Sequence, residues 1–435
     1  MKLKVEKLAL VIGVLIYIAC LYIGYIYLIS PSYSYYSLIN LQPSGSVKAI
    51  SIILALIPII WSESTVTRPS QVVYWLLYIL VYIPTMVMPD FVRENPLDGF
   101  FFYKLVLLGC LALLASVGKW KQLKIYPLRI KQAFVRTMLY ISWFGLFGLI
   151  FLKFGFHFRM VNFYDVYDIR AGYHEEGRGT IAAYAMNWQS KIFNPLLMGI
   201  GVISKKTMFI IIGIISQFII FSTTGQKSIA FSTLFILGIL WCVGKKGKNF
   251  GVRFLYSICL LVMACLALDF ILGGIQFTEI LTRRLMMVPG VLSSFYYDYF
   301  TANPQTHLGY SIFSSFVEYP YDVTPPFLIG EAYFNNLEAS ANANLWADAF
   351  SAFGLWGVAI YTGILAVILW VYDSIAKYNH FLLSVVLLAM PIWSLIDSSL
   401  ITTFLTHGLL LAIIINYLLT AKITNKGAEK NEARI

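Results

Sequence analysis

Apolar residues occur in long blocks along this chain, and short polar segments separate the blocks. The blocks are about 20 residues long, which is the length at which a helix spans roughly 30 Å of hydrocarbon. A membrane β-barrel would instead show alternation over about 10 residues. A helix satisfies its own backbone hydrogen bonds inside lipid, so these blocks predict transmembrane helices. The expected spans are 8–29, 47–62, 71–88, 99–117, 135–154, 183–203, 207–222, 228–243, 253–273, 346–371, 380–397 and 400–420.

This pattern predicts an all-α fold, a polytopic membrane bundle of about twelve transmembrane helices that forms one integral domain over 1–435. The first block is longer than a signal-peptide core and has no small-residue cleavage site, so we expect an uncleaved first span. Two connections are long, 155–182 and 274–345, and both fall on the side opposite the termini. Long loops in compact domains are usually functional or disordered. The second is rich in aromatic and aliphatic residues, so we expect it to form short helices.

Composition and charge agree with a membrane protein. The chain is 59% hydrophobic and 12% charged, with a mean hydropathy of +0.75, whereas soluble domains are about half apolar and a quarter charged. The net charge of +11 does not indicate a nucleic-acid partner, because the basic residues are not gathered on one domain. Of the 32 Lys and Arg, 21 fall on the side of the termini. The positive-inside rule therefore predicts that both termini are cytoplasmic.

The five cysteines all lie inside apolar blocks, where they are typical of small buried hydrophobic residues. The sequence contains no CxxC pair, no HExxH motif and no nucleotide-binding glycine fingerprint. We therefore expect no metal site and no cofactor.

The first long loop carries Arg170, His174, Glu175 and Arg178 among several glycines. Guanidinium groups bind phosphate through two parallel hydrogen bonds, and glycines let backbone N–H groups approach an anion. His174 and Glu175 are candidates for an acid or a base. The alternative is a solvated loop in which these charges pair locally.

The second long loop begins with Arg283 and Arg284 among apolar residues at helical spacing, followed by Pro289 and Gly290. This pattern predicts a short helix at the membrane interface that ends at the Pro-Gly pair. Both arginines would lie at the level of lipid phosphates, either in a binding site or as ordinary contacts to head groups.

Further along the same loop, His307 and Glu331 are additional candidates for an acid or a base. Aromatic residues near them would suit sugar rings, although aromatic residues at an interface are also common membrane anchors.

The segment that enters the tenth span contains Asn342, Asn344 and Asp348, which could contact a substrate. Asn344 and Asp348 are four residues apart and would share a helix face. Asn344 could instead be a helix cap. An ionisable Asp348 at the membrane boundary costs free energy, which favours a functional role for it.

At this point the chain resembles the bacterial O-antigen polymerase family, which joins oligosaccharide repeat units. The resemblance rests on the number of spans, the two outer loops with arginines, and the stretch that holds Asn342, Asn344, Asp348 and Gly354. The same stretch is similar to the O-antigen ligases, in which a His, an Asn-type residue, nine residues and Gly-x-x-Gly follow one another. Asn344 and Gly354 to Gly357 fit that spacing, but Ala343 occupies the position of the ligase histidine.

The resemblance implies a glycosyltransferase in the bacterial inner membrane with its chemistry at the periplasmic face. Its substrates would be oligosaccharides linked to undecaprenyl diphosphate, and its partners would include membrane lipids and a chain-length regulator protein. It would release undecaprenyl diphosphate. Arginines can stabilise such a leaving group, and a general base must deprotonate the acceptor hydroxyl. The arginine candidates are Arg170, Arg178, Arg283 and Arg284. The base candidates are His174, Glu175, His307 and Glu331.

Three alternatives remain open: an O-antigen ligase, a flippase or transporter of lipid-linked oligosaccharides, and a scaffold without activity. Ala343 argues against a ligase. A transporter would bury charged residues in the middle of the membrane, whereas the ionisable residues in or near the spans lie mostly at span ends.

Overall fold

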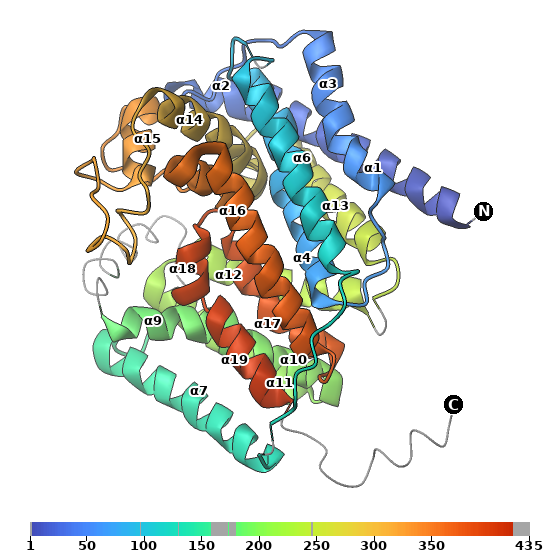
Figure 1. Cartoon of the computed structure of the whole chain (residues 1–435), viewed down its shortest axis with the longest axis vertical. Coiled ribbons are helices and arrows are strands. Elements are labelled where there is room, and N and C mark those ends of the chain that lie inside the picture. Colours follow the sequence, from blue (N-terminus) through green and yellow to red (C-terminus); the bar gives the residue numbers. More distant parts are fainter. Residues whose placement is uncertain are drawn as a thin grey trace. The chain divides into compact units, whose positions relative to one another are not determined.

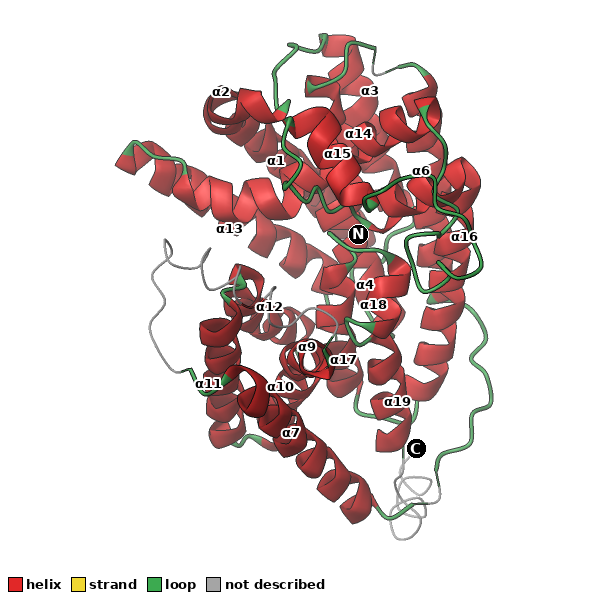
Figure 2. Cartoon of the chain, turned by 90° about the vertical axis from the view of Figure 1, so that its left-hand side faces the viewer, coloured by secondary structure: helices red, strands yellow, loops and turns green. Residues whose placement is uncertain are grey.

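The computed structural model describes residues 2–95, 97–128, 130–157, 173, 180–244 and 247–420. The structure is 76% helix and contains no strand in the described part of the chain, as Figure 2 shows. The predicted all-α fold class is confirmed. The described residues divide into two compact units. Unit 1 comprises Met1–Trp120, Lys245–Leu369 and Trp393–Ile401, and unit 2 comprises Lys121–Gly244, Trp370–Ile392 and Thr402–Ile435.

Unit 1 holds the N-terminal helices and most of the helices after residue 245 (Figure 1). Its elements are α1 (Lys2–Gly24), η1 (Tyr25–Ile29), α2 (Ser30–Tyr33), η2 (Ser34–Tyr36), α3 (Gly45–Leu56), η3 (Ile57–Ile60), α4 (Pro69–Leu77), η4 (Tyr78–Tyr82), α5 (Ile83–Val87), η5 (Pro89–Phe91), α6 (Gly99–Val117), α13 (Phe250–Leu272), η7 (Thr278–Met287), α14 (Val288–Ala302), α15 (Pro325–Phe334) and most of α16 (Leu345–Ala376).

Unit 2 is built from the central helices and the C-terminal ones. These are α7 (Gln132–Phe154), α9 (Ile181–Trp188), η6 (Gln189–Phe193), α10 (Asn194–Ser204), α11 (Thr207–Thr224), α12 (Lys227–Val243), most of α17 (Phe381–Ser394), most of α18 (Leu400–Leu405) and α19 (Leu409–Leu419).

The centre of unit 1 is the helix over Pro69–Phe91, which is buried along almost its whole length. Tyr78 and Tyr82 are fully buried, and their hydroxyls donate hydrogen bonds to the carbonyls of Ala55 (2.8 Å) and Leu54 (3.0 Å) on α3. Hydrogen bonds of this kind hold helices together where apolar burial alone gives little preference for one partner.

The core of unit 2 combines an apolar cluster with a polar one. Apolar side chains of α7, α9, α11 and α12 pack together, among them Phe147, Ala185 and Ile220. Next to them the buried Asn194 donates a hydrogen bond to Gln217 (3.0 Å) and accepts hydrogen bonds from other side chains. Hydrogen bonds of this kind between buried polar side chains fix the register of the helices that they join.

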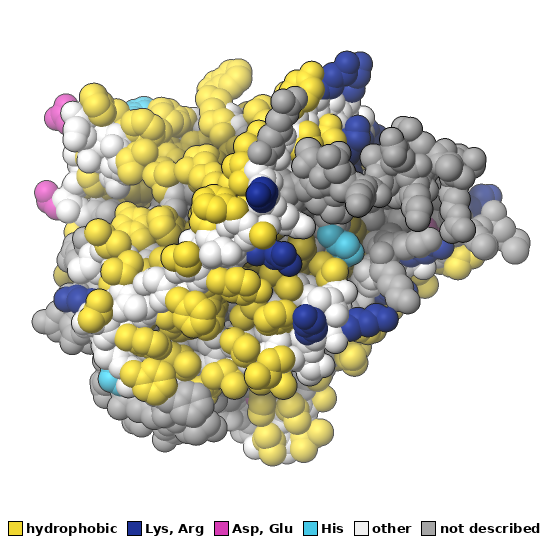
Figure 3. Space-filling view, turned by 90° about the horizontal axis from the view of Figure 1, so that it is seen from below, with side chains coloured by type: hydrophobic (Ala, Val, Ile, Leu, Met, Phe, Trp, Pro, Cys, Tyr) yellow, Lys and Arg dark blue, Asp and Glu magenta, His cyan; other side chains and the backbone are white. Residues whose placement is uncertain are grey.

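Eight helices in the described part are long and apolar enough to cross a membrane, which indicates a multi-pass membrane protein. They are Lys4–Tyr36, Pro69–Phe91, Gly99–Val117, Gln132–Phe154, Thr207–Thr224, Phe250–Leu272, Leu345–Ala376 and Leu400–Leu419. Each coincides with an expected span. Large apolar side chains lie exposed on these helices, for example Leu152 at 86%. Figure 3 shows hydrophobic side chains over much of one face, as lipid contact requires.

The four remaining expected spans are also helical. Three of them fall on the shorter apolar helices Gly45–Ile60, Lys227–Val243 and Phe381–Ser394. The fourth, 183–203, falls on the continuous helix formed by α9, η6 and α10, which carries polar residues and is not among the eight. The total of twelve spans therefore stays a prediction.

About half of the segment expected to be the second long loop is helical, and it differs from the prediction in one respect. Pro289 and Gly290 do not end a helix, because η7 continues through them into α14. The prediction was wrong because Pro289 lies where five-residue π turns give way to the first turn of α14. A proline is tolerated in a first turn. Gly290 instead allows close packing, since a Cβ there would lie 2.7 Å from the Pro84 backbone of α5.

Candidate functional site

The candidate site lies at the beginning of α16, where Asn344 holds this end of the helix in place. The side-chain oxygen Oδ1 of Asn344 accepts hydrogen bonds from the backbone N–H groups of Trp346 (3.0 Å) and Ala347 (3.2 Å), so the residue is a helix N-cap. Its amide nitrogen donates to Pro289 O (3.0 Å) and Ser293 Oγ (2.8 Å) on α14. An asparagine side chain has about four hydrogen-bonding positions. All are used within the protein, so Asn344 positions α16 on α14 rather than offering groups to a ligand.

A kink at Phe353 and Gly354 folds the first two turns of α16 back onto the rest of the helix. Gly354 has φ +59°, which favours glycine. Gly357 permits the close approach that follows, because a Cβ there would lie 2.0 Å from the Ala349 carbonyl oxygen. Across the fold, the Trp346 indole donates a hydrogen bond to Thr362 Oγ1 (3.0 Å). The two glycines of the Gly-x-x-Gly sequence thus serve the geometry of the kink.

The kink leaves backbone carbonyls at the end of the first turns without helical partners, and the segment after α14 satisfies them. The N–H groups of Thr306 and His307 donate to the carbonyls of Ser351 (2.9 Å) and Ala352 (3.2 Å). His307 has φ +44°, and its exposed side chain packs its ring against Phe353 at 5.6 Å. These bonds bring Tyr310 next to α16.

Asp348 is the candidate functional group in this arrangement. The residue is only 7% exposed, and its carboxylate accepts a hydrogen bond from the Tyr310 hydroxyl at 2.6 Å. Its second oxygen, Oδ2, has no hydrogen-bond partner among the described residues. The hydroxyl of Tyr361, which is close enough to interact electrostatically with Asp348, also has none there. A buried carboxylate oxygen and a buried hydroxyl therefore both lack a hydrogen-bond partner among the described residues, which in a native protein calls for an explanation.

Tyr310 is a hydrogen-bond donor at every physiological pH. Burial and the adjacent Asp348 carboxylate hold the pKa of the Tyr310 phenol well above its ordinary value. The hydroxyl therefore keeps its proton and fixes Asp348 Oδ1, which leaves Oδ2 as the oxygen that can accept a proton.

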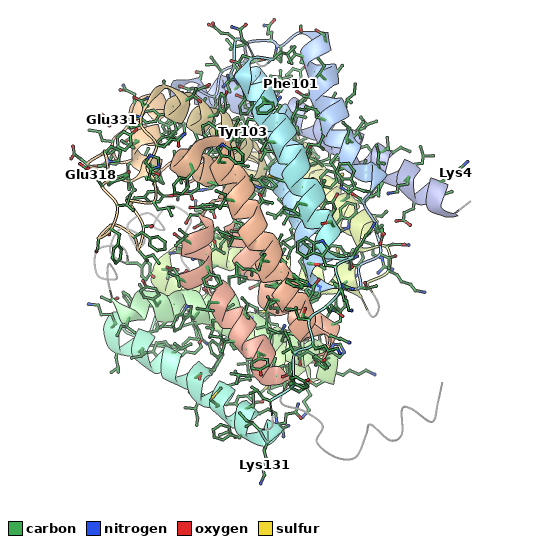
Figure 4. All side chains as sticks on the ribbon, in the orientation of Figure 1. Lys4, Phe101, Tyr103, Lys131, Glu318 and Glu331 are labelled. Carbon is green, nitrogen blue, oxygen red and sulfur yellow. The ribbon has the colours of Figure 1, made fainter. Side chains whose placement is uncertain are left out.

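The structure places two other predicted site residues on the surface near this site. Asn342 is exposed and accepts a hydrogen bond from Ser340 (3.1 Å). Glu331 is exposed on α15, and Figure 4 shows it with Glu318 at the same edge of unit 1. Neither His307 nor Glu331 shares a hydrogen bond with Asp348.

The arginines of the second loop differ from each other. Arg283 is partly buried, lies over the Tyr33 ring at 4.1 Å, and forms an ion pair with Glu279 at 3.4 Å. Arg284 is exposed. The other four predicted site residues, Arg170, His174, Glu175 and Arg178, lie outside the described residues.

Sequence reasoning missed a second charged group in unit 1, which is centred on Arg93. Its guanidinium forms ion pairs with Asp98 (2.8 Å) and with Asp298 on α14, and it lies over the Tyr297 ring at 5.6 Å. Burial raises the pKa of the Asp298 carboxyl, and Arg93 opposes that rise. Tyr297 in turn packs on Phe350 of α16 at 4.9 Å. The sequence places Arg93 in the connection 89–98, and this connection is too short to have suggested a functional site.

A cavity of about 360 Å³ adjoins this group, and its lining is Leu41, Gln42, Pro43, Ser44, Val47, Arg93 and Glu94. In the described part of the chain, no three His, Cys, Asp or Glu residues come together as a metal site would require.

No family model, no curated protein and no solved structure is similar enough to this chain to show which family it belongs to.

Proposed function

We propose that this chain is a membrane glycosyltransferase that polymerises oligosaccharide repeat units linked to undecaprenyl diphosphate at the periplasmic face of the bacterial inner membrane. The resemblance in sequence motivates the proposal. The observation that carries it in the structure is the Asp348 carboxylate, which is buried, held by Tyr310, and left with one oxygen free of partners among the described residues.

The reaction joins the two substrates in one displacement. The acceptor hydroxyl oxygen forms a bond to the anomeric carbon of the donor sugar. The bond from that carbon to the phosphate oxygen breaks, and its electron pair leaves with undecaprenyl diphosphate. The acceptor proton passes to Asp348 Oδ2, which takes the role of general base among the described residues. Arg283 and Arg284 are the described candidates for the developing charge on the diphosphate, beside Arg170 and Arg178.

The test is deletion of the gene in the source strain, with the surface polysaccharide separated on a gel. We expect the ladder to collapse to a single repeat unit, and the wild-type gene to restore it. Asp348→Asn, expressed at the wild-type level in the membrane fraction, should not restore the ladder. Glu63→Gln, which alters an exposed carboxylate of the same unit that lies outside the segment 303–344, is the matched control and should restore it.

A deletion strain with an unchanged ladder would refute the proposal. Loss of even the single repeat unit would favour the ligase or the flippase instead. The flippase has one observation in its favour, because Asp90 and Lys104 form a buried ion pair between the apolar helices Pro69–Phe91 and Gly99–Val117. The ligase remains disfavoured by Ala343, which is buried where the ligases have histidine.

A further inference from the structure

Four tyrosines form a continuous row that leads to the Asp348 carboxyl group. The ring centroids of Tyr299 and Tyr321 are 6.2 Å apart, those of Tyr321 and Tyr319 are 5.7 Å apart, and those of Tyr319 and Tyr310 are 6.0 Å apart. Tyr310 ends the row with its hydrogen bond to Asp348. We call Tyr299, Tyr321, Tyr319 and Tyr310 the tyrosine row. All four are partly exposed, so the row connects the surface of unit 1 with a buried acceptor oxygen.

The hydroxyls of Tyr310, Tyr319 and Tyr321 already donate hydrogen bonds within the protein, so these three residues offer mainly their ring faces to a ligand. The Tyr319 hydroxyl donates to the carbonyl of Val323 at 2.6 Å, and the Tyr321 hydroxyl donates to the carbonyl of Pro304. Gly309 packs beneath Tyr319, where a Cβ would lie 2.8 Å from the tyrosine Cβ. The rings are thus held in fixed positions, and a ligand can bind to them without ordering them first.

The charges around the row decide which ligand fits it. The segment 303–344 contains the carboxylates Glu318, Asp322, Glu331 and Glu338, and it contains no Lys or Arg. Glu331 is close enough to interact electrostatically with Tyr299, and Figure 4 shows Glu318 and Glu331 at the same edge of unit 1. This surface repels phosphate, anionic lipid head groups and acidic sugars. It suits uncharged or amino sugars, whose C–H faces pack on aromatic rings and whose hydroxyl or ammonium groups donate to carboxylates.

We propose that the tyrosine row is the binding subsite of the acceptor oligosaccharide, and that it takes neutral or amino sugars. The terminal sugar lies at Tyr310 with its hydroxyl at Asp348 Oδ2, and the preceding sugars lie on Tyr319, Tyr321 and Tyr299. This inference rests on the proposed function. It adds the place of the acceptor, the direction in which its sugars run, and the class of sugar that is accepted.

The experiment measures binding of a lipid-free oligosaccharide to the purified full-length chain in detergent. The probe is the repeat-unit oligosaccharide released by mild acid from the polysaccharide of the source strain, and saturation-transfer NMR reports the contacts. We expect Tyr321→Ala and Tyr299→Ala each to weaken binding by about tenfold, because the aromatic surface is lost. Tyr321→Phe keeps the ring and should bind within about twofold of the wild type. Tyr126→Ala removes an exposed tyrosine of unit 2 that is distant from the tyrosine row in the sequence, and this variant should bind like the wild type.

Several results would overturn the inference. If the wild type binds the oligosaccharide and both alanine variants bind it equally well, the acceptor lies elsewhere while the proposed function stands. Absence of binding to the wild type would also refute the row as an acceptor site. The proposed function would then be tested separately, by the polysaccharide ladder of the deletion strain. If the alanine variants bind the oligosaccharide normally but incorporate poorly into phosphatidylcholine vesicles, the row is a membrane anchor. A monodisperse elution profile is required of every variant.

Discussion

A buried ion pair in unit 1 accounts for a charged residue that the sequence pattern alone does not explain. Lys104 Nζ donates hydrogen bonds to Asp90 Oδ1 (2.7 Å) and Ser51 Oγ (2.9 Å), and both charged side chains are almost completely buried. Lys104 stands near a span end in the sequence, but nothing there identifies Asp90 as its partner. An ion pair in this setting offsets its own desolvation only while both partners are present.

Removal of one partner should therefore destabilise the protein more than removal of both. We expect Asp90→Leu alone to lower the free energy of unfolding by about 3–5 kcal/mol, because it leaves an unpaired ammonium group in an apolar surrounding. The double variant Asp90→Leu with Lys104→Met should recover most of that loss. Thermal unfolding in detergent, followed by thiol-reactive fluorescence, measures both. Equal losses in the single and the double variant would contradict this account.

Asn344 and Asp348, both predicted to contact a substrate, differ in their hydrogen-bond partners. Asn344 is a cap with all its hydrogen-bonding positions in use, whereas Asp348 has a free oxygen among the described residues. The spacing of the two residues suggested a shared helix face, but only Asp348 is in the helix. The sequence alone could not separate these roles, because both residue types suit a cap and a binding site equally well.

At the scale of elements, the kinked α16 is the part that creates the site. A straight helix would carry Tyr361 more than three turns away from Asp348, at about 1.5 Å per residue. The kink instead brings the two side chains together. It depends on Gly354 for its backbone conformation and on Gly357 for the contact with the Ala349 carbonyl.

Substitution of Gly357 should therefore damage both stability and activity. We expect Gly357→Ala to cost roughly 1–3 kcal/mol, because the new Cβ would overlap the Ala349 carbonyl oxygen. Gly363→Ala is the matched control in the same helix, since nothing lies within 4 Å of its Cβ position. A helix-interior alanine there should raise stability by about 0.5–1 kcal/mol. Unfolding temperature and restoration of the polysaccharide ladder are the two measurements, and similar values for both variants would argue against the role of the kink.

At the scale of the whole molecule, the property to be tested is the membrane topology, that is, the side of the membrane on which each connection lies. Eight helices meet the length and composition of a membrane span, and the distribution of Lys and Arg predicts which connections are cytoplasmic. According to that prediction, Lys119 faces the cytoplasm and Glu331 faces the opposite side, together with the tyrosine row.

Single cysteines test this topology. The five native cysteines are buried and form no disulfide, so they should contribute little background. We expect a membrane-impermeant maleimide to label Glu331→Cys in cells whose outer membrane has been permeabilised. Lys119→Cys, which alters a side chain that is 66% exposed, should react only after the inner membrane is also opened. The reverse pattern would invert the topology and would remove the tyrosine row from the side on which the proposed reaction occurs.

The fold class and the approximate position of the helices could be predicted from the amino-acid pattern, because an apolar block of membrane length has few structures open to it other than a helix. The pattern also drew attention to the segment around Asn344 and Asp348. The pairings between residues became visible in the folded chain: Asp90 with Lys104, Arg93 with Asp298, and Tyr310 with Asp348. Such pairings join residues that are distant in sequence or separated by a kink, and the periodicity of side chains carries no information about them. The wrong helix end at Pro289 has the same origin, since packing on α5 and the preceding π turns overrode the local signal.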